Sequence, residues 1–428
     1  MRIYVKGFGC SSSIADAEVL AGCLMKADYV IVNNLQAADL VLYNTCAVKT
    51  PTENRVINLL KKVPPEKKLV ITGCLPLVNF ARLRKEVRFD AVGGPALGTK
   101  IVNIVKAVSS DSHVEMLDCC SDDMPRLTLP RVRVNRLVSA IPISYGCLGS
   151  CSYCCVRFAR GRLRSYGVEE ILKKVKADLD DGVHEFWLTS QDTACYGRDI
   201  ATNLPNLLEH VCSVEGDFLI RVGMMTPNHL SDFFDALIDV FRNDKIFKFL
   251  HLPLQSGDDT VLKRMKRFYS TEDFTSIIKK FRAAFPRSTI ATDIIAGFPG
   301  ESASAFRRTI KLVEEIRPDI LNISKFFARP KTPAESMPKQ VAPLEIKHRS
   351  TRLAGLARHM ASERNKTWIG WRGKILIDEM VKQGSVVGRN FAYKPVVIRH
   401  NDSHKMLGKF VTVKVNDAFQ SHLLGEII

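Results

Sequence analysis

The segment SYGCLGSCSYC (144–154) places three cysteines at C-x3-C-x2-C spacing, at the end of an apolar, strand-like run. Cys147, Cys151 and Cys154, here called the motif triad, can ligate three irons of a [4Fe–4S] cluster and leave the fourth iron open. An open iron can bind S-adenosylmethionine, whose reductive cleavage yields the 5′-deoxyadenosyl radical. The alternative is a structural zinc site, which needs four ligands. No histidine or further spaced cysteine lies nearby, and Cys155 is poorly placed to be a fourth ligand, so the segment favours an iron–sulfur site.

The same segment opens a series of strand-like and helical stretches that continues to about residue 335. Helical patterns, such as Val168–Asp181 and Leu230–Arg242, alternate with apolar runs. The candidate strands are 138–146, 185–191, 218–225, 247–255, 289–298 and 319–327. Repeated strand–helix units predict a partial or complete α/β barrel over residues 136–335, in which chemistry collects at the carboxyl ends of the strands. A connecting helix is expected over 336–366.

Residues 1–110 also alternate strands with helices, and a cysteine ends each of three candidate strands. These strands, 2–10, 38–46 and 68–74, end at Cys10, Cys46 and Cys74, here called the dispersed triad. The pattern predicts an open parallel α/β sheet. The carboxyl ends of such strands share one edge, where ligands bind, so the three cysteines would meet. They suggest a second [4Fe–4S] cluster that holds or donates sulfur, and chance alignment of buried cysteines is the alternative.

Two further regions complete the chain. The polar segment 111–135 has the composition of an interdomain linker. Residues 367–428 hold short Val- and Ile-rich runs separated by glycines, a pattern typical of a small five-stranded β-barrel. The expected fold class is therefore α/β with a small all-β domain at the end.

The remaining cysteines carry less information than the two triads. Cys23 and Cys212 fall on apolar helix faces, where cysteines behave as small hydrophobic residues, and they are expected in the core. Cys195 lies in a loop, and Cys119 and Cys120 lie in the linker. For these three, a redox or structural function is the less favoured interpretation.

Composition and charge suit a globular protein that meets a polyanion. The 428 residues are 46% hydrophobic and 25% charged, which excludes a disordered, collagen-like or coiled-coil chain. Lys and Arg total 62 against 45 for Asp and Glu, and the surplus of +17 is spread over the whole chain. Such a charge favours nucleic acid as a partner, with a merely basic enzyme as the alternative. Neither a transmembrane stretch nor a signal peptide is evident, so a cytoplasmic protein without a membrane partner is expected.

At these residues the chain resembles the radical-SAM methylthiotransferases over nearly its whole length. Both triads match the cysteine pattern of that family, and so do several segments of the predicted barrel. These segments are SYGCLGSCSYC, LTSQDTACYG, HLPLQSG, TDIIAGFPGE and FFARPKTPA. The resemblance implies a methylthiotransferase domain over 1–110 that carries an auxiliary cluster, a radical-SAM barrel over 136–335 and an RNA-binding TRAM barrel over 367–428. It also implies two [4Fe–4S] clusters and S-adenosylmethionine as cofactors.

Three further segments are similar to the archaeal and eukaryotic MtaB-like branch of this family. They are GCSSSIADAEVLAG (9–22), NTCAVKTPTENR (44–55) and RVGMMTP (221–227). That branch adds a methylthio group to C2 of N6-threonylcarbamoyladenosine at position 37 of tRNA. Ser13 stands where the first motif usually has Asn, and Leu77 where the third usually has Gln, but neither change removes a ligand. The alternatives are isopentenyladenosine-37 tRNA or a ribosomal-protein aspartate as substrate, and a non-catalytic protein that binds zinc and RNA.

Polar residues at the ends of the barrel strands are candidates for binding S-adenosylmethionine. Gln191 and Asp192 end the second strand, where related enzymes bind the methionine amino group. The other candidates are Gln255, Ser256, Asp293, Gly297, Glu301 and Arg221. Arg221, on the third strand, could meet a carboxylate of the cofactor or substrate, or form a structural ion pair.

The basic tail is expected to bind the tRNA backbone. Its cationic residues are Lys374, Lys382, Arg389, Lys394, Arg399, Lys405, Lys409 and Lys414. Phe391 and Tyr393 could stack on bases, although a place in the barrel core is favoured for both. The resemblance also implies a reductant protein, such as a flavodoxin or ferredoxin, and a sulfur donor.

Overall fold

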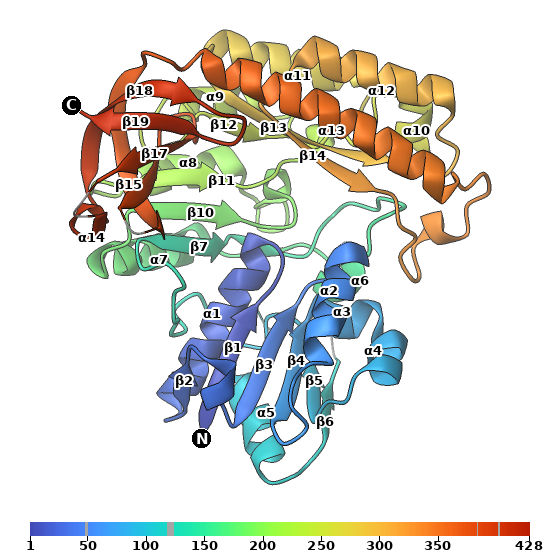
Figure 1. The fold of residues 1–428 in the computed structure, drawn as a ribbon, viewed down its shortest axis with the longest axis vertical. Helices are drawn as coiled ribbons and strands as arrows, with labels where there is room; N and C mark the ends of the chain where they lie inside the picture. The colour runs from blue at the N-terminus through green and yellow to red at the C-terminus, as the bar shows by residue number, and fades with distance from the viewer. Residues whose placement is uncertain (48–49, 118–123, 383, 401–402) are drawn as a thin grey trace.

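The structure, a computed structural model, describes residues 1–47, 50–117, 124–382, 384–400 and 403–428. Cys119 and Cys120 lie outside these residues. Figure 1 shows three parts: an N-terminal sheet (blue), a central set of β/α units (green to orange) and a C-terminal barrel (red). This arrangement confirms the predicted fold class. No helix in the described part of the chain is long and apolar enough to cross a membrane.

The N-terminal part is a six-stranded sheet in the order β2-β1-β3-β4-β5-β6, and every neighbouring pair is parallel. The strands are β1 (Arg2–Gly7), β2 (Val30–Val32), β3 (Leu40–Thr45), β4 (Lys68–Gly73), β5 (Ala91–Gly93) and β6 (Val114–Met116). The three strands predicted from the sequence are β1, β3 and β4, which lie side by side in this order. The strands β2, β5 and β6 were not predicted, since each has only three residues and carries a weak pattern.

Helices cover both faces of this sheet. The helices are α1 (Ser11–Lys26), α2 (Thr50–Leu60), α3 (Cys74–Val78), α4 (Phe80–Glu86) and α5 (Lys100–Ser109). Side chains of a strand alternate between the two faces. In β3, Leu40 and Leu42 pack with α1 and α5, while Val41 and Tyr43 pack with α2, α3 and α4. The predicted linker is packed against the N-terminal part. The strand β6 falls inside it, and the Val132 N–H donates to the Glu18 carbonyl of α1 at 3.0 Å.

The central part holds six parallel strands in two groups of three, ordered β7-β10-β11 and β12-β13-β14. They are β7 (Val138–Pro142), β10 (Glu185–Thr189), β11 (Leu219–Val222), β12 (Phe249–His251), β13 (Thr289–Ala296) and β14 (Ile320–Lys325). A parallel bridge between Ile220 and Ile246 joins the groups. All six match predicted strands, and the barrel is a partial one.

Outer helices pack on these strands and form the largest hydrophobic core of the described residues. They are α7 (Val168–Asp180), α8 (Leu204–Cys212), α9 (Phe234–Val240), α10 (Asp259–Arg264), α11 (Thr271–Ala284), α12 (Ala303–Ile316) and α13 (Pro343–Lys366). Phe186, Leu188 and Ile220 point into that core. Residues alternate along a strand, so Trp187 and Arg221, paired in the register of β10 and β11, point to the barrel interior.

The C-terminal part is a closed five-stranded barrel, as predicted, in the order β15-β16-β17-β19-β18. Its elements are β15 (Arg372–Lys382), β16 (Ser385–Arg389), β17 (Pro395–Arg399), α14 (Ser403–Met406), β18 (Phe410–Ala418) and β19 (Leu423–Ile427). Figure 1 shows it beside the ends of β10 and β11 opposite their arrowheads, which are the amino ends of those strands. Lys394 is buried there, with its Nζ 3.0 Å from Asp319 and 2.8 Å from the Asn365 side chain.

The structure therefore corrects part of the predicted basic surface. Lys394 has a structural ion pair, and Arg389 lies 3.8 Å from Asp378 with most of its side chain buried. The exposed basic residues are Lys374, Arg399, Lys405 and Lys409, while Lys414 is half-buried and the Lys382 side chain lies outside the description. Tyr393 packs against Phe247 and Phe249 of the central part instead of in the barrel core, so it is an interface residue. Phe391 is 37% exposed beside Trp368 and Trp371, so the core interpretation fails for it.

Candidate active site at the interface of two cysteine triads

The motif triad lies between two short paired strands, in the loop that precedes a short helix. The strand β8 (Ser144–Tyr145) pairs with β9 (Arg164–Ser165), and the helix α6 (Val156–Arg160) follows the last triad cysteine. Gly146 has a φ of +75°, and a Cβ there would lie 1.8 Å from the Arg162 carbonyl oxygen, so only glycine fits. The three thiols are half-buried. The chain thus turns sharply at the strand end and presents the triad at the carboxyl edge.

The loop leaves room for a group bound to these sulfurs. A Cβ on Gly149 would lie 3.2 Å from the Cys147 sulfur and 3.7 Å from the Cys151 sulfur, so this glycine keeps the space between them clear. The Gly149 N–H donates to the Cys147 sulfur at 3.2 Å. Arg267, which is buried, places Nη1 3.5 Å from the Cys151 sulfur. Amide and guanidinium donors of this kind stabilise thiolates. Burial raises the pKa of the Cys147 thiol to about 11, and the Asp192 carboxylate adds to the rise.

The dispersed triad does converge in space, as the sheet topology requires. Cys10 precedes α1, Cys46 follows β3, and Cys74 begins α3 directly after β4. Thr45 and Gly73 are register partners, so Cys46 and Cys74 leave the sheet at the same level. Gly9 has a φ of +110°, and a Cβ there would lie 2.5 Å from the Cys46 Cβ, which brings the Cys10 segment against Cys46. Burial raises the pKa of Cys74 to about 12, the guanidinium of Arg160 opposes this rise, and Cys46 and Cys10 add to it.

Neither triad has the spacing of a single zinc site. Among the described residues, the three sulfurs of each triad do not all lie within 4.8 Å of one another. A tetrahedral zinc with Zn–S bonds of about 2.3 Å would bring its sulfurs to within about 4 Å. Three thiols without a histidine or carboxylate ligand are the donor set of an iron–sulfur cluster. The residues present therefore fit a [4Fe–4S] cluster at each triad.

The two triads face one interface between the N-terminal and central parts. Cys155 and Ala159, at and within α6, pack in the hydrophobic core of the N-terminal sheet. Arg160, the last residue of α6, places Nη2 2.7 Å from Asp16 of α1, and the Tyr145 hydroxyl donates to the same carboxylate at 2.8 Å. The helix that leaves the motif triad therefore ends beside the dispersed triad. Figure 1 shows α6 next to α2 and α3, below the central strands.

A second ion pair joins the same two parts. Arg329, in the segment after β14, pairs with Glu53 of α2, and its Nη1 donates to the Thr50 hydroxyl at 3.2 Å. Both charged side chains are buried. Breaking a buried pair by removing one partner costs about 3–5 kcal/mol, so this contact holds the interface closed.

Three predicted S-adenosylmethionine contacts carry a buried oxygen without a partner. These oxygens are Gln191 Oε1, Ser256 Oγ and Glu301 Oε1, and none of them has a hydrogen-bond partner among the described residues. Buried polar atoms are almost always paired, so orphaned atoms at the strand ends point to a ligand. Gln255 has a φ of +67°, an uncommon conformation for a residue other than glycine, and it extends the pairing with β13 through Ile294.

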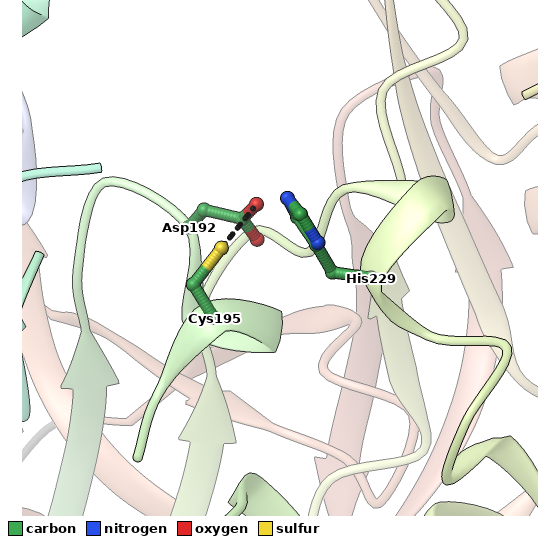
Figure 2. Close-up of side chains that lie close together, drawn as sticks. All are labelled: Asp192, Cys195 and His229. Carbon is green, nitrogen blue, oxygen red and sulfur yellow. Dashed lines mark hydrogen bonds between the residues drawn. The ribbon is translucent and has the colours of Figure 1, made fainter. Parts of the chain in front are cut away.

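Asp192 belongs to a compact group that the sequence did not bring together, shown in Figure 2. Its carboxylate accepts from the Ala194 N–H at 3.1 Å, the Thr226 N–H at 2.9 Å and the Cys195 thiol at 3.3 Å. His229, in the 3-10 turn Pro227–His229, completes the group. An Asp192 carboxylate oxygen, the Cys195 sulfur and a ring nitrogen of His229 all lie within 4.8 Å of one another. These bonds tie the loops after β10 and β11 together. Asp192 thus has a structural use, and no local sequence signal links it to His229.

The remaining candidates are engaged in contacts within the protein. Asp293 lies 2.8 Å from His251 Nε2. Glu301 accepts from the Gly297 N–H at 2.7 Å and pairs with Arg349 of α13 at 2.8 Å, which fastens the connecting helix to the barrel.

Arg221 forms no ion pair among the described residues, so the structural alternative proposed for it is wrong. Its guanidinium lies over the rings of Trp187 at 5.6 Å, Phe249 at 5.2 Å and Tyr393 at 5.2 Å. These cation–π contacts take the place of the structural ion pair. Because Tyr393 belongs to the C-terminal barrel, Arg221 joins that barrel to the central interior.

Comparison with known proteins places this geometry in a family. A model of the radical SAM superfamily matches residues 141–313, and a model described as uncharacterized protein family UPF0004 matches residues 2–94. The probable threonylcarbamoyladenosine tRNA methylthiotransferase of Pyrococcus horikoshii is 38% identical over 430 residues, covering 100% of both chains. The threonylcarbamoyladenosine tRNA methylthiotransferase of Homo sapiens is 36% identical over 99% of this chain and 74% of its own.

A solved structure agrees at the level of the fold. The radical S-adenosylmethionine methyltransferase TsrM from Kitasatospora setae has a TM-score of 0.57 at 14% identity, covering 78% of this chain and 74% of its own. With full-length relatives of this identity and a matching radical-SAM region, the chain belongs to the threonylcarbamoyladenosine tRNA methylthiotransferases of the radical SAM superfamily.

Proposed function

We propose that this chain adds a methylthio group to C2 of N6-threonylcarbamoyladenosine at position 37 of tRNA, giving the 2-methylthio derivative. The single observation that carries the proposal is the meeting of two cysteine triads at one interface. The helix α6 leaves the motif triad, packs in the core of the N-terminal sheet and ends with Arg160 beside the dispersed triad. A reaction that needs both a radical and a sulfur source requires two such sites close together.

The substrate explains why both sites are needed. Adenine C2 carries no acidic proton, so acid–base chemistry cannot functionalise it. With S-adenosylmethionine, a cluster on the motif triad would supply the 5′-deoxyadenosyl radical and a cluster on the dispersed triad would hold the sulfur.

The chain's own residues would hold and orient these groups. Cys147, Cys151 and Cys154 would ligate one cluster, and Cys10, Cys46 and Cys74 the other. The orphaned oxygens of Gln191 and Ser256 would bind S-adenosylmethionine. The ion pair of Arg329 with Glu53 would keep the interface closed, which excludes water from a reactive radical.

The proposed reaction also defines its partners. The exposed cationic residues of the C-terminal barrel would bind tRNA phosphates, and an unpaired loop nucleotide can be unstacked into the site more easily than a paired one. Reductive cleavage needs an electron, which a flavodoxin or ferredoxin would deliver. The methylthio group needs a sulfur donor.

Nucleoside mass spectrometry tests the proposal. The chain is reconstituted with iron and sulfide without oxygen, then incubated with S-adenosylmethionine, a reductant and tRNA that contains N6-threonylcarbamoyladenosine. The expected result is a gain of one methylthio group on that nucleoside. Cys74→Ala should form 5′-deoxyadenosine without this product, while Cys23→Ala, a buried cysteine outside both triads, should retain the product.

Other outcomes of this experiment would indicate a different substrate or a different kind of protein. A methylthio group on isopentenyladenosine or on a ribosomal-protein aspartate would change the substrate and keep the chemistry. A colourless protein that holds zinc and forms no 5′-deoxyadenosine would overturn the proposal.

A further inference from the structure

Arg160 is a buried guanidinium placed between the two triads. Its residue is 3% exposed, Nη2 lies 2.7 Å from Asp16, and its guanidinium lies 5.5 Å from the centre of the Tyr145 ring. Its side chain also lies within hydrogen-bonding reach of the Cys74 thiol. Burying a guanidinium is costly unless charged groups surround it, so a further anionic partner beside Asp16 is favourable.

The dispersed triad supplies that partner. Cys74 packs in the same hydrophobic cluster as Cys155 and Ala159, and Arg160 directly follows Ala159 at the end of α6. Three thiolates on a cluster would place concentrated negative charge at this buried position, where the effective dielectric is low. The Asp16 carboxylate offsets the charge of Arg160, and the triad would bring further negative charge beside both residues.

The motif triad has a comparable but separate partner. Arg267 is buried with Nη1 3.5 Å from the Cys151 sulfur, and its remaining contacts are the Tyr269 hydroxyl at 3.2 Å and the Pro253 carbonyl at 3.3 Å. Each triad therefore has its own buried guanidinium. They differ because Arg160 is paired with the carboxylate of Asp16. The net charge beside the dispersed triad can therefore be changed by substituting either Arg160 or Asp16.

We propose that Arg160 is a positioning residue that raises the reduction potential of a cluster on the dispersed triad, and that Asp16 limits this effect. The inference rests on the proposed function, since that function places a cluster there. Nearby positive charge and N–H donors stabilise the reduced, more negative cluster, and a nearby carboxylate destabilises it.

Redox titration followed by electron paramagnetic resonance tests the inference. Cys147, Cys151 and Cys154 are replaced by Ala in the full chain so that only the dispersed triad loads a cluster. In this background Arg160→Gln should shift the midpoint potential to more negative values. Asp16→Asn should shift it to more positive values, and Arg160→Lys, which keeps the charge, should stay closer to the parent than Arg160→Gln.

The matched control is Arg267→Gln. It should leave the potential of the dispersed-triad cluster unchanged, and it should lower the potential of the motif-triad cluster in a chain that lacks Cys10, Cys46 and Cys74. If Arg160→Gln fails to load iron, Asp16→Asn and Arg160→Lys decide the question: Asp16→Asn should shift the potential to more positive values while Arg160→Lys stays near the parent, and an unchanged potential in Asp16→Asn overturns the inference.

The outcomes separate the inference from the proposed function. Unchanged potentials, or shifts of the same sign for Arg160→Gln and Asp16→Asn, overturn the inference, because a merely structural role does not produce opposite shifts. A wild-type chain that loads about four irons instead of about eight has no second cluster, and that result overturns the proposed function instead.

Discussion

The predicted contacts to S-adenosylmethionine differ in what their polar atoms do in the protein. Gln191 Oε1 and Ser256 Oγ are buried without partners among the described residues, whereas Asp192 accepts three hydrogen bonds. An unpaired buried atom lowers stability until a ligand binds it, and a paired atom contributes to stability without one. Gln191 is therefore expected to bind the cofactor, while the adjacent Asp192 is expected to stabilise the fold.

Substitution of two adjacent residues tests this distinction. Gln191→Ala should raise the KM for S-adenosylmethionine about tenfold, the effect of losing about 1.4 kcal/mol, with little change in the free energy of unfolding. Asp192→Ala should lower the free energy of unfolding by about 1–3 kcal/mol, because buried amides lose their acceptor. The measurements are 5′-deoxyadenosine formation against cofactor concentration, and urea denaturation. Equal effects of both variants on KM and stability would contradict the assignment.

Among the elements, the contact of β10 with β15 brings two carboxyls into the boundary between the central part and the C-terminal barrel. Glu185 begins β10 and Asp378 lies in β15, and both are buried. Burial raises the pKa of Glu185, the Asp378 charge adds to the rise, and Arg389 opposes it. Burial raises the pKa of Asp378 as well, again opposed by Arg389.

This pair predicts a stability that falls with rising pH. A carboxyl whose pKa is higher in the folded state keeps its proton while the unfolded chain loses one, so folding is favoured at low pH and disfavoured as pH rises past the ordinary carboxyl range. The free energy of unfolding should therefore decrease between pH 5 and pH 8, and Glu185→Gln should make this decrease smaller. Urea denaturation at the two pH values measures it. Asp378→Asn should act in the same direction, and an undiminished decrease in both variants would contradict the prediction.

For the whole molecule, the basic residues of the C-terminal barrel fall into two groups. Lys394 is buried against Asp319 and holds the barrel to the central part, while Arg399 and Lys409 are exposed. Removal of residues 367–428 would leave Asp319 without Lys394 and Arg221 without Tyr393, so the loss of RNA binding could not be told from damage to the fold. Point substitutions at exposed positions avoid this difficulty.

Charge reversal on the barrel surface tests its use in RNA binding. Arg399→Glu with Lys409→Glu should raise the KM for tRNA and lower the slope of log affinity against log salt by about 1 for each lost phosphate contact. Formation of 5′-deoxyadenosine without tRNA should not change. Lys311→Glu, an exposed residue of α12, is the matched control and should leave the KM unchanged. An unchanged KM in the double variant would remove the barrel surface from the interface.

The order of the longer strands and helices, the motif triad and the five-stranded C-terminal barrel could all be predicted from the residues alone. These features depend on local spacing: period-2 and period-3.6 patterns, glycines between short strands, and cysteines within eight residues of one another. The prediction for the dispersed triad needed one further step, the rule that parallel strands end at a common edge. The three-residue strands β2, β5 and β6 were missed because such short runs carry too little pattern.

Which charged residues lie beside the cysteine triads, and which form ion pairs that hold the parts of the fold together, depends on tertiary packing. Arg160 meets Asp16 across 144 positions of the chain, Lys394 meets Asp319, and His229 joins Asp192 and Cys195. Burial and partner choice depend on how distant elements pack, and a lysine in a β-strand has the same local sequence whether it faces solvent or a buried carboxylate. For this reason the two cysteine triads could be predicted from sequence, while the guanidinium beside the dispersed triad could not.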